Sequence, residues 1–234
     1  LQGSKIYVGS QTGPSLEFNE YSGENSNPHN IIWGNNRIDE TSSYIYLIDG
    51  YKYFEEHGIN LVNLPIKAVV HEHPDVIPSY ADSSGISYSN MQSGDPSTSY
   101  HELTHSILFE LNPALTNQVV HEAIAQFFEF HLLNNFNNKV LNDPATIKAH
   151  TIRYVVLNNV RSEEHKLGYA VDSALWKIKN KLGNDETVDL ILRAVTLGNN
   201  GGISNFPQFI EKLLLADDNN NNLNDGTPNK ITIC

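Results

Sequence analysis

The strongest constraint on the fold is the segment His101–His105, which reads HELTH. Residues four positions apart lie on one face of an α-helix, so the imidazoles of His101 and His105 can reach one metal ion. Glu102 is rotated by about 100° from His101, close enough to act on a water molecule at that ion without binding it. The following residues are apolar, as in a buried helix: Ile107, Leu108 and Leu111. The segment predicts a buried helix with two ligands for catalytic zinc.

A catalytic zinc ion needs three protein ligands and one open position, so a third ligand must come from another element. The next predicted helix carries His121 and Glu122, and sixteen residues separate Glu122 from His105. That gap leaves room for a helix end, a short loop and a returning antiparallel helix. Three alternatives remain open on the residues alone: Glu122, His121, or no third ligand.

HELTH followed by a helix of the form E-A-I-x-x-F resembles the gluzincin metallopeptidases, in particular their thermolysin-like and fungalysin-like families. The resemblance implies that Glu122 is the third zinc ligand. It also implies that Gln126 supports a ligating histidine, at a position where the family usually has Asp. A glutamine oxygen can accept a hydrogen bond from that histidine but carries no charge.

Two further segments extend the resemblance. Glu164–Gly168, followed by Ala174–Trp176, is similar to the fungalysin-like H-x-x-G…L-W segment. This similarity implies that His165 stabilises the oxyanion of the reaction, with Tyr169 as a second candidate donor. Upstream, Tyr80–Ala81 is similar to the edge strand that aligns a peptide substrate in these enzymes.

Apolar periodicity predicts an α+β fold, with mixed structure in the first hundred residues and helices afterwards. The predicted strands are Lys5–Val8, Asn30–Trp33, Ile66–His71 and the hairpin Tyr80–Ala81 with Ile86–Ser89. The predicted helices are Glu40–Gly58, Thr98–Leu111, Thr116–Asn134, Pro144–Asn159, Gly168–Leu182, Glu186–Gly198 and Asn205–Ala216. The resemblance further implies a two-lobed zincin fold, in which an α/β lobe (1–111) ends in the HExxH helix. A helical lobe (112–234) supplies the third ligand, and the active-site cleft lies between the two.

Near the end of the chain, an Asp/Asn-rich segment carries alternate oxygen-bearing side chains in a turn-prone stretch. This composition suits Ca²⁺, which takes about six to eight oxygen ligands. The sequence therefore predicts a possible calcium site formed by Asp217, Asp218, Asn220, Asn222, Asn224 and Asp225.

The chain has a formal net charge of −12, with 27 acidic and 15 basic residues and no Lys/Arg cluster. These features argue against a nucleic-acid partner. No apolar stretch approaches the roughly 18 residues of a membrane span. The only cysteine is Cys234, so no internal disulfide is possible.

The function predicted is a zinc endopeptidase in which Glu102 is the general base towards a zinc-activated water. Its partner would be a peptide or protein substrate. The expected form is a monomer, secreted and of bacterial type, a localisation inferred from function because no signal peptide is visible. An aminopeptidase is an alternative, although the G-A-M-E-N type signature is missing before His101. A catalytically inactive zinc-binding module is another, which intact Glu102 disfavours.

Overall fold

The computed structural model describes residues 3–10, 38–73, 78–89, 92, 94–136, 163–199, 202–218, 222–224 and 226–234. Within them the fold is α+β, mostly helical, with seven helices and one four-stranded sheet, which confirms the predicted class. Two compact units are formed by residues 1–106 and 107–234. The predicted lobe boundary after residue 111 stays a prediction. None of the described helices combines the length and apolarity that crossing a bilayer would require.

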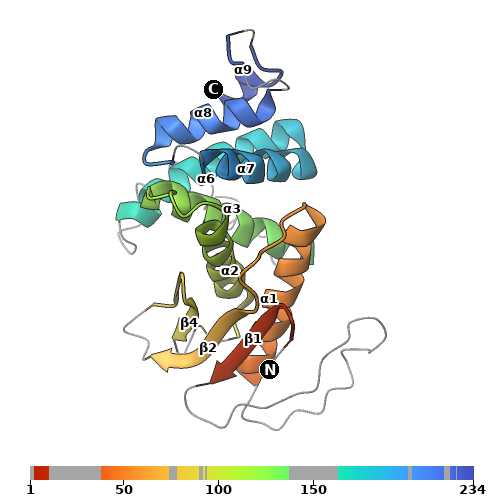
Figure 1. Cartoon of the computed structure of the whole chain (residues 1–234), viewed down its shortest axis with the longest axis vertical. Coiled ribbons are helices and arrows are strands. Elements are labelled where there is room, and N and C mark those ends of the chain that lie inside the picture. The colour runs from red at the N-terminus through yellow and green to blue at the C-terminus, as the bar shows by residue number, and fades with distance from the viewer. Residues whose placement is uncertain are drawn as a thin grey trace. The chain divides into compact units, whose positions relative to one another are not determined.

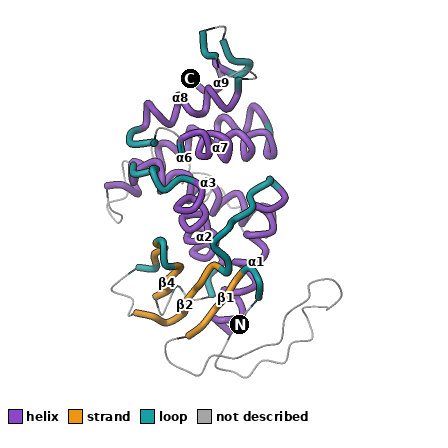
Figure 2. The backbone as a smooth tube through the Cα atoms, viewed as in Figure 1, coloured by secondary structure: helices purple, strands orange, loops and turns teal. Residues whose placement is uncertain are grey.

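All strands of the described structure belong to the first unit (Figure 2). They are β1 (Ile6–Ser10), β2 (Ile66–His73), β3 (Tyr80–Asp82) and β4 (Gly85–Ser89). The sheet order is β1-β2-β4-β3, with β1 and β4 parallel to β2. Strands β3 and β4 pair in antiparallel fashion, which confirms the predicted hairpin. The predicted strand Asn30–Trp33 lies outside the described residues.

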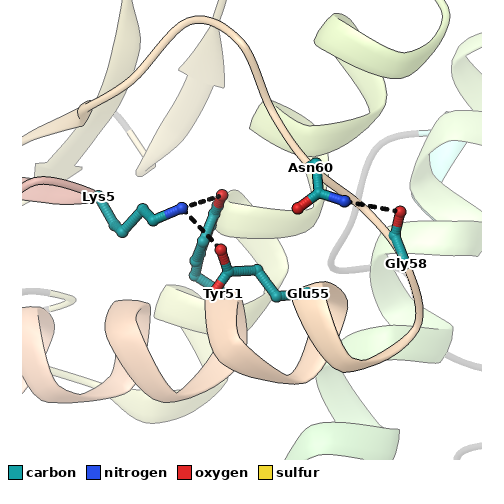
Figure 3. A network of polar contacts seen from close by, with 5 residues as sticks. All are labelled: Lys5, Tyr51, Glu55, Gly58 and Asn60. Carbon is teal, nitrogen blue, oxygen red and sulfur yellow. Dashed lines mark hydrogen bonds and ion pairs between the residues drawn. The ribbon is translucent and has the colours of Figure 1, made fainter.

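Helix α1 (Ile38–Glu56) packs against β1 and β2. Figure 3 shows the polar contacts at this junction: the Nζ atom of Lys5 lies 2.7 Å from Oε1 of Glu55 and 3.5 Å from the hydroxyl oxygen of Tyr51. Such a part-exposed ion pair contributes at most about 1 kcal/mol. The helix ends before Gly58, whose φ of 81° is the left-handed conformation expected of a glycine that terminates a helix.

Helix α2 (Pro96–Leu111) carries the HELTH segment. Asp95 caps its first turn, because an Asp95 carboxylate oxygen accepts hydrogen bonds from the backbone N–H of Thr98 at 2.7 Å and from its hydroxyl at 2.8 Å. Helix α1 touches α2 at Gly50, where a Cβ atom would lie only 2.7 Å from a methyl carbon of Leu103. This close approach fixes α2 against the core of the first unit.

The second unit is helical in its described part (Figure 1). It contains α3 (Gln118–Phe136), α6 (Glu163–Leu182), α7 (Asn184–Gly198), α8 (Phe206–Asp217) and the short α9 (Lys230–Ile233). Helix α6 packs along both α3 and α7, and α8 packs on α7. The predicted helix Pro144–Asn159 lies outside the described residues.

Predicted helix starts in this unit differ from the structure, and α7 begins at Asn184 rather than Glu186. The first turn of α3 is capped by Asn117 rather than Thr116, because the Asn117 side chain accepts a hydrogen bond from the backbone N–H of Val120 at 3.0 Å. Helix α6 begins at Glu163 rather than Gly168. Gly168 lies inside the helix because its missing side chain allows a close contact with α3.

Candidate metal centre

The two histidines of α2 converge as their spacing predicts. Both side chains are buried, with 9% of His101 and 8% of His105 exposed. Their Nε2 atoms lie 3.0 Å apart, and the ring centroids are 4.7 Å apart. Two imidazole nitrogens at this distance need a proton or a cation between them, because their lone pairs would otherwise repel. The pair is therefore suited to a shared cation.

Helix α3 supplies the third member of the group. His101, His105 and Glu122 each offer one ligand atom, and all three atoms lie within 4.8 Å of one another. His121, the alternative third ligand, is not in the group. Its ring packs against Phe109, with centroids 4.7 Å apart.

The donor set fits zinc. Zinc binds histidine nitrogen and carboxylate oxygen at about 2.0–2.2 Å, so neighbouring ligand atoms of a tetrahedral ion lie about 3.4 Å apart. The 3.0 Å separation of the two nitrogens is slightly shorter than that value, and the 4.8 Å limit on all three atoms is longer. Two nitrogens and one oxygen suit zinc and similar transition metals, whereas calcium takes oxygen ligands. A metal ion can therefore bind here, and the described part of the chain contains no other group of this kind.

Glu102 is buried beside the pair, with 6% exposed. It lies close to a buried hydroxyl network in which Tyr88 donates a hydrogen bond to Ser99 at 3.1 Å. Burial raises the pKa of the Tyr88 hydroxyl, the bond to Ser99 lowers it, and the charge of Glu102 raises it further. Glu102 thus sits in surroundings that exclude water, although its role as a base stays a prediction.

The roles predicted for Gln126, His165 and Tyr169 are not seen in the described structure. Gln126 is fully buried, but neither polar atom of its amide has a hydrogen-bond partner within the described structure. Its predicted bond to a histidine ligand is therefore not formed here. His165 lies on α6, but its side chain is outside the described residues. Tyr169 is half-buried on the same helix, and its carbonyl accepts a hydrogen bond from Ser173 at 2.8 Å.

The described residues of the Asp/Asn-rich segment form hydrogen bonds with one another and with Asn229. Both carboxylate oxygens of Asp217 accept hydrogen bonds from Asn229, at 2.6 and 2.7 Å. Asp218 accepts one from the backbone N–H of Asn222, and the Asn222 side chain accepts two from Asn224. Asn220 and Asp225 lie outside the described residues. These bonds close turns between α8 and α9, and the calcium site stays a prediction.

A buried polar pair on α6 was missed by the sequence reasoning. Asp172 is fully buried and Lys179 is 6% exposed, and the Lys179 Nζ atom lies 3.6 Å from the ring centroid of Trp176. Burial lowers the pKa of Lys179 to about 8, while the charge of Asp172 opposes that shift. The signal in the sequence was the spacing of residues 168, 172, 175 and 179, which places them on one face of a helix.

Comparison with protein-family models gave no match, and comparison with curated proteins gave no significant match. The chemistry of the site therefore carries any functional conclusion.

Proposed function

We propose that the protein is a zinc-dependent endopeptidase of the gluzincin type. The observation that carries this proposal is the gathering of two imidazole nitrogens and one carboxylate oxygen within 4.8 Å, next to a buried glutamate. Three protein ligands leave the open position that separates a catalytic zinc site from a structural one.

His101, His105 and Glu122 would hold the metal. The chemistry that bound zinc supplies is polarisation of a carbonyl group and activation of water at neutral pH. Glu102 accepts the proton released when water attacks the peptide carbonyl and delivers it to the leaving amine. Because Glu102 is buried, bulk water does not compete for that proton.

His165 is proposed to donate a hydrogen bond to the oxygen that becomes negatively charged, and Tyr169 is a second candidate for this role. The three-residue strand β3 is the edge of the sheet, with Tyr80 45% exposed. An extended peptide would add to the sheet at this strand through backbone hydrogen bonds. These roles belong to a two-lobed zincin fold with the substrate between the lobes. We further propose that the enzyme acts outside the cell as a secreted monomer.

The decisive test combines zinc content with cleavage of a quenched-fluorescence peptide library. We expect one zinc per chain, cuts inside the peptides, and loss of activity in excess chelator with recovery on adding zinc. Glu102→Gln should keep its zinc and lose activity by on the order of 10²–10⁴-fold, the range for a removed general base. Wild-type rates in that variant would remove Glu102 as the base.

The same experiment separates the rival functions. Release of single residues from peptide N-termini would indicate an aminopeptidase. One bound zinc with no cleavage of any library member would indicate a binding module.

A further inference from the structure

Helix α6 lies directly against the part of α3 that carries Glu122, and the contact is made at the buried Gly168. A Cβ atom on Gly168 would lie 3.1 Å from the Cβ atom of Glu122. It would also lie 3.3 Å from the backbone nitrogen of Ala123 and 3.4 Å from Oε1 of Gln126. Optimal contacts between carbon atoms are about 3.5–4.0 Å, so a side chain here would push α3 and α6 apart.

Buried packing contributes to holding this part of α3 in place. Ala123, Ile124 and Gln126 are fully buried, and the Gln126 amide has no hydrogen-bond partner in the described structure. The surface of α6 at Gly168 is one of the surfaces that hold the segment. A change in that surface therefore reaches Glu122 directly.

We propose that Gly168 is a positioning residue for the metal site. Because it has no side chain, α6 can hold the Cβ atom of Glu122 where the carboxylate joins the His101–His105–Glu122 group. An added methyl group would move that Cβ atom by a few tenths of an ångström, whereas metal–ligand distances tolerate only about 0.2 Å. Metal affinity thus depends on the packing of α6 on α3, although α6 contributes none of the three ligands of the group.

The first measurement is the zinc affinity of the full chain, by competition with a fluorescent chelator. Gly168→Ala is expected to weaken zinc binding by about 10–100-fold, as changes that displace a ligand through its support commonly do. Gly198→Ala is the control, since the nearest neighbours of its Cβ atom would be Nδ2 of Asn112 at 2.6 Å and Ile203 at 2.7 Å rather than Glu122. This control should lower the urea midpoint yet keep zinc affinity within about twofold, as expected for an independent site.

A double-variant cycle tests whether Gly168 acts through Glu122. In a Glu122→Ala background, Gly168→Ala should cause no further loss of zinc affinity. Equal losses in both backgrounds, or unchanged affinity in Gly168→Ala alone, would overturn the inference. Because the inference rests on the proposed zinc site, wild-type affinity is measured first, and a wild type that binds no zinc contradicts the proposed function instead.

Amide hydrogen exchange of the wild-type protein is a second test, and it does not depend on a variant that folds. If α6 holds Glu122, zinc binding should slow amide hydrogen exchange around Gly168 on α6 as well as on α3. Zinc-dependent protection of α3 with none on α6 would overturn the inference.

Discussion

Helices α2 and α6 both bury polar side chains, but in different arrangements. On α2, His101, Glu102 and His105 stand in one five-residue segment, and the two imidazoles converge on a point. On α6, Asp172 and Lys179 are about two turns apart on the packing face and compensate each other's charge. We infer that the buried polar groups of α2 serve a ligand, whereas those of α6 serve the fold. Three experiments test this difference.

The largest effect is expected on α2. Structural zinc sites with four ligands bind with about 10–16 kcal/mol, so removing one ligand should cost roughly 3–4 kcal/mol. His105→Ala should therefore weaken zinc binding by about 10²–10³-fold. His121→Ala is the matched control, because His121 is buried beside Glu122 but outside the group. A large loss of zinc in His121→Ala, with little in a Glu122→Ala variant, would transfer the third-ligand role to His121.

A smaller effect is expected from breaking the pair on α6. Asp172→Ala removes the negative charge that partly offsets the burial of the Lys179 ammonium, which should lower the free energy of unfolding by about 2 kcal/mol. Lys179→Met keeps the apolar stem but leaves the buried Asp172 carboxylate without a nearby positive charge, so it should also lower the free energy of unfolding. Urea unfolding of the zinc-free chain measures both. Unchanged stability in both variants would show that the charges do not compensate each other.

The smallest effect is a pH dependence. The pKa of Lys179 is about 8 in the folded chain, against 10.5 for an unperturbed lysine. Between these values the unfolded chain binds more protons than the folded one, so the free energy of unfolding rises as pH increases through this window. The gain should be on the order of 1–2 kcal/mol, because water still screens part of the ammonium. Urea midpoints across the window measure it, and a gain of the same size in Lys179→Met would assign it to other groups.

The same contrast explains how much the sequence could predict. The His101–His105 segment needs only helical geometry to bring its imidazoles together, so the first two members of the His101–His105–Glu122 group and their helix followed from local spacing. The β3–β4 hairpin was equally local, since Asp82 and Gly85 bracket its turn. Glu122 was one of three open alternatives, because its position depends on the packing of a second element.

Contacts that depend on the packing of one helix against another could not be predicted from the sequence pattern. Gly168 suggested a helix start, because a glycine inside a helix is costly unless a neighbour requires the space, and the neighbour was unknown. Lys179 is buried, although lysine is rarely buried without compensation. The contact of Gly168 with Glu122 has no sequence signature of its own.

The register of the sheet has a consequence for the order of assembly. Ile6 of β1 pairs with Ile66 of β2, sixty positions further along the chain. Closing a loop of that length costs roughly 4 kcal/mol of chain entropy before any strand contact compensates for it. The hairpin and the individual helices, by contrast, join near neighbours and can form early. Strand β1 is therefore expected to be the last strand to join, so the first unit completes its sheet only at the end of folding.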